Sequence, residues 1–184
     1  MPSQIQVQPK GIQSPGDAGT EDIILKSQLQ FMADCRDKRL GEGDRKWKFS
    51  CPESLVLHYG RFWTPQPKPK DVRWGRQKQC FSNAHDLANC RPDLTYCEGF
   101  ALDQSIPEAF CHAWCVDRNG NVVDNTWRTP GRAYMGIPLN LRWVSQVIFS
   151  LGTYGVLLEG DVFYNVKLLQ RGIPARAIAG RFRR

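Results

Sequence analysis

The sequence predicts an α+β domain in which helices pack on antiparallel strands. Three observations carry this prediction. A segment with helical character, 82–90, is followed by two β-compatible segments, 94–102 and 110–116. The second of these runs into Asp117-Arg-Asn-Gly-Asn121, in which Asn-Gly is a strong short-range signal for a tight hairpin turn. The order of a helix followed by hairpin-connected strands is typical of α+β folds.

The remaining segments define the expected organisation of the chain. Residues 1–20 are rich in Pro, Gly, Gln and Ser, a composition that predicts a disordered leader. Residues 21–70 are predicted to hold a helix over 21–40 and a proline-rich connector over 64–70. Residues 71–184 form the predicted main domain. Within this domain, further strands are expected at 122–127 and 134–139, and helices at 141–151 and 161–170. A strand or a helical turn is expected at 53–59, before the domain begins.

The composition is that of a globular protein with an ordinary core. The chain has 184 residues and a hydrophobic share of 41%, so its size requires neither disulfides nor a structural metal. We find no apolar run of about 18 residues, the length of a membrane span, and no apolar stretch near Met1 typical of a secretory signal. These features predict a cytoplasmic protein without a membrane association, whose seven cysteines are mostly reduced thiols.

The chain is basic, with a net charge of +7 and a pI near 9.2. Part of the excess collects just before Cys80, at Arg73, Arg76 and Lys78. Such a surface favours an acidic partner or nucleic acid. The basic residues do not follow one helix face, however, and they are not interleaved with an aromatic platform for RNA. Nucleic-acid binding is therefore the weaker prediction for the main function.

The residues around Cys80 indicate a thiol nucleophile. Cys80 lies where a loop enters the predicted helix, and the N–H groups and positive partial charge of a helix N-terminus favour a thiolate. Arg76 and Lys78 add positive charge nearby. The same N–H groups could bind an oxyanion, with Gln77 or Gln79 as supporting donors.

His112 and Asp124 are the predicted partners of this thiol. They lie on the two strands of the predicted hairpin, and pairing around Asn119-Gly120 places His112 opposite 126–128, with Asp124 on the diagonal. The register alone permits contact between the two side chains and does not require it. Trp114 and Trp127 are expected to be packing walls around the site. No metal or organic cofactor is implied.

Taken together, these residues resemble a known enzyme group. The run Cys80, Phe100-Ala101, His112-Ala113-Trp114 and Val123-Asp124-Asn125-Thr126 is similar to the core of transglutaminase-like cysteine enzymes, within the wider papain-like superfamily. Asn125 stands where that family usually has proline. The resemblance covers residues 75–128, and it implies a nucleophile helix packed on an antiparallel sheet, with 71–184 as the catalytic domain.

The resemblance also implies an activity. Cys80, His112 and Asp124 would form a triad in a thiol hydrolase or acyltransferase acting on an amide or ester of a peptide, protein or peptidoglycan-like substrate. The segments Gln79–Ala84 and Tyr96–Ala101 further resemble signatures of phage-associated proteins, which extends the expected location to the cytoplasm of a phage-infected bacterium. An alternative is a basic phage or host-takeover binding protein on an inactive papain-like scaffold, contacting nucleic acid or an acidic host protein.

Two other interpretations use the same cysteines. Cys97 begins a Cys-x-x-Phe-Ala box that makes it the alternative nucleophile, but only 15 residues separate it from His112, too few for a helix and a strand. Cys80, His85 and Cys90 have a spacing similar to the end of a zinc knuckle. That motif needs another cysteine at position 77, where the chain has Gln77. Without a catalytic or metal-binding role, the cysteines are expected to pack in the core and Asp124 to cap the end of a strand.

Overall fold

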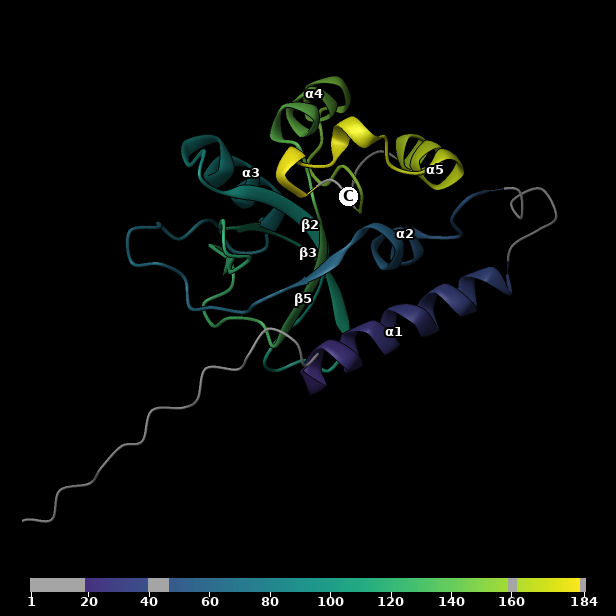
Figure 1. Cartoon of the computed structure of the whole chain (residues 1–184), viewed down its shortest axis with the longest axis horizontal. Helices are drawn as coiled ribbons and strands as arrows, with labels where there is room; N and C mark the ends of the chain where they lie inside the picture. The colour runs from purple at the N-terminus through teal and green to yellow at the C-terminus, as the bar shows by residue number, and fades with distance from the viewer. Residues whose placement is uncertain (1–18, 40–46, 159–161, 183–184) are drawn as a thin grey trace, which may run out of the picture.

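A computed structural model describes residues 19–39, 47–158 and 162–182 of the chain. Within these residues the protein forms an α+β fold of five α-helices and one curled, five-stranded antiparallel sheet (Figure 1). The predicted α+β class is confirmed. The predicted leader, 1–20, lies outside the described residues apart from its last two, and Thr20 already begins the first helix.

The sheet is antiparallel at every pairing. Its strands are β1 (Arg61–Trp63), β2 (Thr95–Leu102), β3 (Ala109–Val116), β4 (Val122–Val123) and β5 (Ala133–Pro138). They lie in the order β1-β5-β2-β3-β4, so β2 is central and pairs with both β3 and β5. The short edge strand β1 comes from the segment predicted to precede the main domain, and it joins the same sheet.

The sheet curls until its two edges meet at one end. Thr64, which follows β1, accepts a hydrogen bond from Val122 N–H at 2.9 Å, and its own N–H donates to Gly120 O at 3.1 Å. The curl creates a concave inner face filled by large side chains. Trp63, Trp114 and Tyr134 are buried there, with Trp127 and Phe182 packed against the cluster.

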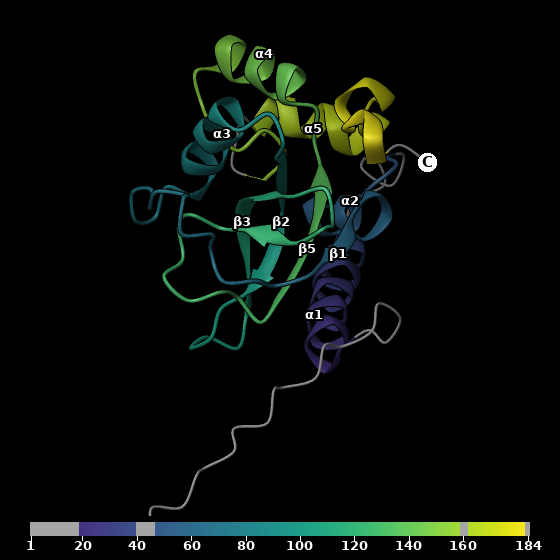
Figure 2. The same cartoon turned by 60° about the vertical axis from the view of Figure 1, so that its left-hand side comes forward.

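The helices cover the outer face of the sheet. They are α1 (Thr20–Asp37), α2 (Pro52–Tyr59), α3 (Cys80–Cys90), α4 (Leu141–Leu151) and α5 (Val162–Arg171), followed by two short 3-10 turns, Ala175–Ala177 and Gly180–Phe182. In two views α3, α4 and α5 gather at one end of the sheet, whereas α1 lies toward the other (Figures 1 and 2). α1 packs on α2 and β5, and α3 packs on β3 and β2. These contacts form the main core, which includes Leu25, Phe81, Phe100 and Ile137.

Most predicted elements have their expected type. The segment 53–59, left open as a strand or a helical turn, is helix α2. Pro52 stands in its first turn, and the Cys51 N–H donates to Ser54 Oγ in a capping box. The returning strand expected over 122–127 ends at Val123 instead. Its end follows from Asp124, whose carboxylate accepts hydrogen bonds from the N–H groups of Thr126 and Trp127 and so turns the chain out of the ladder.

None of the helices in the described ranges is both long and apolar enough to cross a membrane.

Candidate active site

Cys80 is the first residue of α3, two residues earlier than the helix predicted over 82–90. The helix forms there because Phe81, Ala84 and Ala88 present one apolar face to the sheet. The first bond within the helix runs from Asn83 N–H to Gln79 O at 2.9 Å, so the amides of residues 80–82 lie at its open end. The Cys80 side chain is only partly buried and lines a cavity of about 420 Å³.

The loop before Cys80 has an unusual backbone held by one asparagine. Lys78 has a φ of 60°, a left-handed conformation that is uncommon for a residue with a side chain. Asn83 Oδ1 accepts from Arg76 N–H at 3.0 Å, and its Nδ2 donates to Arg76 O at 2.7 Å and to Thr126 Oγ1 at 2.9 Å. A Cβ on Gly75 would lie 2.3 Å from Asn83 Cγ, so only glycine fits beside this clamp. Asn83 thereby ties the loop before Cys80 to the loop after Asp124.

His112 lies on β3 and points to the inner face of the sheet. It is 2% exposed, and its Nε2 makes a hydrogen bond to Asp124 Oδ2 at 2.7 Å. The imidazole stacks on the Trp127 ring with centroids 4.0 Å apart and an interplanar angle of 14°. Because Nε2 is taken by Asp124, Nδ1 is the ring nitrogen left for the thiol. The Cys80 side chain lies within hydrogen-bonding reach of this ring.

Asp124 is positioned by four hydrogen-bond donors. Its Oδ1 accepts from the N–H groups of Thr126 at 2.8 Å and Trp127 at 3.2 Å. Its Oδ2 accepts from His112 and from the Tyr134 hydroxyl at 3.1 Å. The strand register explains how the Asp124 carboxylate comes near the His112 ring. Cys115 pairs with Val123, so Asp124 lies diagonally across from His112, as expected. The turn after Val123, rather than a bulge, brings the carboxylate to the ring.

The electrostatics of this pair favour two opposite charges. Burial disfavours the charged form of His112, but the Asp124 carboxylate, together with a hydrogen bond to Cys80, outweighs it and raises the pKa of His112 to about 9. Burial likewise opposes the charge on Asp124, yet the adjacent His112 keeps the pKa of that carboxyl below its ordinary value. At neutral pH the pair is therefore an imidazolium and a carboxylate, held in a dry part of the inner face.

The supporting residues divide between two cavities. Gln77 and Trp127 line the 420 Å³ cavity together with Cys80 and His112. Gln79 lines a larger, neighbouring cavity of about 1040 Å³. Trp114 is fully buried beneath the site, with its ring 6.0 Å from that of His112, and therefore supports the imidazole from within the core. Only one of the two predicted tryptophans thus lines the cavity.

Cys97, the alternative nucleophile, lies on β2 in the inner cluster and is completely buried. Burial raises the pKa of the Cys97 thiol well above its ordinary value. A thiol without solvent access and without a tendency to ionise is poorly suited to nucleophilic attack. Of the two candidates, only Cys80 reaches a cavity and a histidine.

Two site residues have no counterpart in the sequence prediction. Tyr134, in the predicted strand 134–139, donates to Asp124 and accepts from Gly131 N–H at 2.8 Å. Asn83 is the clamp described above. The signal for Asn83 was its place in the first turn of the helix predicted over 82–90, where an asparagine side chain tends to bond to backbone groups nearby. Tyr134 gave no local signal, because its contact with Asp124 depends on the curl of the sheet.

The residues of the zinc-knuckle interpretation are not assembled into a site. His85 Nε2 makes a hydrogen bond to Ser145 Oγ at 3.0 Å, and its ring contacts Asn89. Cys90 is exposed at the far end of α3 from Cys80. Within the described ranges, no group of three or more His, Cys, Asp or Glu side chains is arranged to hold a metal ion.

Comparison with known protein families, with curated proteins and with solved structures finds no match to this chain.

Proposed function

We propose that the protein is a thiol hydrolase or acyltransferase that acts on an amide or ester carbonyl, built on a transglutaminase-like, papain-like core. One observation carries the proposal: Cys80 and His112 line the same cavity, and His112 is charged and oriented by a buried carboxylate. An accessible thiol beside an oriented base is the arrangement that nucleophilic catalysis requires. A peptide, protein or peptidoglycan-like amide is the substrate class that this chemistry serves.

The proposed reaction begins with attack of the Cys80 sulfur, as a thiolate, on the carbonyl carbon. A C–S bond forms, and the carbonyl oxygen takes up negative charge near the open amides of the α3 N-terminus and the Gln77 side chain. His112, protonated at rest, gives its proton to the leaving amine or alcohol as the C–N or C–O bond breaks. The product of this half-reaction is a thioester on Cys80 and a neutral His112.

The second half-reaction reverses the proton flow. Neutral His112 takes a proton from water, or from an amine acceptor, as its oxygen or nitrogen attacks the thioester carbonyl. The C–S bond breaks and the imidazolium with its thiolate is restored. Asp124 stays ionised throughout, and its hydrogen bond to His112 Nε2 holds the ring and leaves Nδ1 for proton transfer.

Alkylation by iodoacetamide tests the proposal without knowledge of the substrate. At pH 7, Cys80 is expected to react faster than every other cysteine in the chain, as measured by time-resolved peptide mass spectrometry. His112→Gln should slow Cys80 by at least about tenfold, because a positioned histidine typically contributes 10²–10⁴ in proton-transfer steps. Cys111 is a matched internal control, since it is exposed at the same cavity but lies on the opposite face of β3 from His112.

Uniform slow labelling of the cysteines would contradict the proposal and favour a binding protein on an inactive scaffold. His112→Gln removes a buried ring, so its fold must be verified by circular dichroism. Asp124→Asn provides a second, smaller change at the same pair. It should also slow the alkylation of Cys80, while Cys111 reacts at the wild-type rate.

A further inference from the structure

Four cations line the Cys80 cavity and the cavity beside it. Arg73, Arg76 and Lys78 lie in the loop before α3, and Arg128 lies in the loop after Asp124. Lys78 lines both the 420 Å³ cavity and its 1040 Å³ neighbour, so the two cavities adjoin at this residue. Arg128 lines the smaller cavity, and Arg73 and Arg76 line the larger one. The cations therefore lie both in the cavity that holds the nucleophile and in the cavity next to it.

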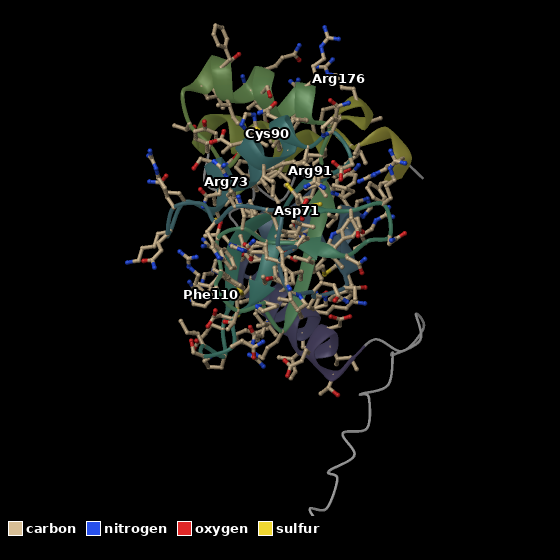
Figure 3. All side chains as sticks on the ribbon, turned by 90° about the vertical axis from the view of Figure 1, so that its left-hand side faces the viewer. Asp71, Arg73, Cys90, Arg91, Phe110 and Arg176 are labelled. Atoms are coloured by element: carbon tan, nitrogen blue, oxygen red, sulfur yellow. The ribbon has the colours of Figure 1, made fainter. Side chains whose placement is uncertain are left out.

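Of the three carboxylates that line these cavities in the described part of the chain, only Asp71 forms an ion pair with an arginine. Asp71 accepts from Arg91 at 2.7 Å, and Asp103 accepts from Ser105 Oγ at 2.6 Å and from Ser105 N–H at 2.8 Å. The remaining acid, Asp86, lies 3.6 Å from His85 Nδ1. In Figure 3 the labelled residues Asp71, Arg73 and Arg91 lie above Phe110, which lines the smaller cavity.

The four cations themselves are not paired with any of these carboxylates. Among the described residues, none of Arg73, Arg76, Lys78 and Arg128 forms an ion pair. Arg76 uses only its backbone N–H and C=O in the Asn83 clamp, and the Arg128 guanidinium lies 4.6 Å from the centroid of the Trp74 ring. A group of cations that the protein does not neutralise is a site for anionic groups of a ligand.

We propose that the substrate is an acidic polypeptide, with Asp or Glu side chains on both sides of the amide that Cys80 attacks. This inference rests on the proposed thiol chemistry, because it assigns a substrate class to the same cavity. Carboxylates before and after the reacting amide would pair with Arg128 on one side, with Arg73 and Arg76 on the other, and with Lys78 between them. Bidentate pairing of arginine with carboxylate would fix the register of the chain across the sulfur.

The aromatic residues of this surface argue for a peptide over single-stranded nucleic acid. Proteins that bind single strands combine cations with exposed aromatic faces on which bases stack. Here the face of Trp127 is covered by His112. Trp74 is 40% exposed, but Lys68 and Arg128 each lie 4.6 Å from its ring centroid. Two further exposed rings stand apart from each other, because Phe110 lines the smaller cavity and Tyr154 the larger one. The site thus offers several charge partners but no continuous aromatic platform for successive bases.

A pair of alkylating reagents measures the effect of these cations on Cys80. Iodoacetate carries a carboxylate and iodoacetamide is its neutral counterpart, so their rate ratio, normalised to that of 2-mercaptoethanol, reports the local potential. We expect a ratio of about three at low ionic strength, falling toward one in 1 M NaCl as the charges are screened. The triple variant Arg76→Gln, Lys78→Asn, Arg128→Gln should bring the ratio close to one. Asparagine is chosen at position 78 because it tolerates the left-handed backbone.

The control variant carries Lys26→Gln and Arg36→Gln, two exposed positions on α1, and it should keep the wild-type ratio. His112 is present in every variant, so only the surface charge differs among them. A ratio near one in the wild-type protein, or the same ratio in both variants, would contradict the substrate class. Failure of Cys80 to outpace the other cysteines with iodoacetamide would contradict the thiol chemistry itself, so the two failures are distinguishable.

Polymer protection then separates the two kinds of polyanion. Poly-L-glutamate should slow the iodoacetamide labelling of Cys80 by at least about threefold at low ionic strength, whereas poly-L-lysine should not. Single-stranded oligothymidylate of equal charge should protect less, since the exposed rings lie in separate cavities and do not form a continuous stacking platform. Protection by oligothymidylate equal to or stronger than that by poly-L-glutamate would overturn the peptide assignment.

Discussion

Two buried carboxylates on opposite faces of the same sheet have opposite electrostatic behaviour. Asp124 lies on the inner face beside His112, and Glu98 points from β2 to the outer face beneath the helices. Each accepts a hydrogen bond from a tyrosine, Tyr134 for Asp124 at 3.1 Å and Tyr96 for Glu98 at 2.8 Å. Backbone N–H groups also donate to each carboxylate, those of Thr126 and Trp127 to Asp124 and those of Val156 and Leu157 to Glu98.

Despite these similar donors, the two acids ionise differently. Burial raises the pKa of Glu98 to about 7, and its hydrogen bonds only partly offset that burial. For Asp124, the adjacent imidazolium keeps the pKa below its ordinary value in spite of burial. The difference shows that hydrogen bonds alone do not keep a buried carboxylate charged in this fold. A buried cation does, and His112 is that cation.

The largest loss of stability is expected when the Asp124 carboxylate, the partner of the charged His112 ring, is removed. Asp124→Ala leaves His112 buried without its carboxylate, and breaking a buried pair in this way typically costs about 3–5 kcal/mol. The matched change on the outer face, Glu98→Gln, keeps the shape but sets an amide NH₂ against a backbone N–H, at a cost of about 1–3 kcal/mol. Urea unfolding at pH 7 compares the two directly. A larger loss for Glu98→Gln would contradict the ranking.

The two sites should also make stability depend on pH in adjacent ranges. His112 has a pKa of about 9 in the folded protein against 6.5 for an ordinary histidine, so the folded state binds more protons between these values and stability falls as pH rises through them. Glu98 has a pKa of about 7 against 4.5, so its proton is also held by the folded state and stability falls from pH 4.5 to 7. Each decrease is on the order of 3 kcal/mol.

Two variants separate these ranges. His112→Gln should remove the decrease between pH 6.5 and 9 and keep the one at lower pH. Glu98→Gln should do the reverse. Free energies of unfolding from urea titrations across pH 4.5 to 9.5 provide the measurement. A wild-type stability that rises over this range would show that neither group has the protonation state described.

The smallest effect distinguishes the two tyrosines. Tyr134→Phe and Tyr96→Phe each remove one donor from a buried carboxylate, and each should lower stability by about 1 kcal/mol. Only Tyr134→Phe is expected to slow the alkylation of Cys80, since Tyr134 holds the acid that orients His112. Equal effects of the two variants on Cys80 would separate Tyr134 from the site.

Local patterns predicted much of this arrangement. The Asn119-Gly120 turn fixed the hairpin, and the hairpin placed Asp124 on the diagonal from His112 as expected. The apolar spacing of α3 indicated a helix near Cys80, although not that it begins at Cys80. Contacts between distant chain segments could not be predicted from local patterns. Tyr134 reaches Asp124 only because the sheet curls, and the Glu98 carboxylate accepts hydrogen bonds from Val156 and Leu157, 58 and 59 residues further along the chain. The early end of the strand at Val123 escaped prediction because the Asp124 side chain competes with the ladder.

The protonation state of His112 tests the central claim most directly. The chain has three histidines, so comparison with His112→Gln assigns the ring ¹⁵N resonances of His112 in a uniformly labelled sample. The buried pair predicts that both ring nitrogens carry protons at pH 7.5 and that they titrate together near pH 9. A neutral His112 ring at pH 7.5, titrating near the ordinary value of 6.5, would contradict the charged pair and with it the role of His112 beside Cys80.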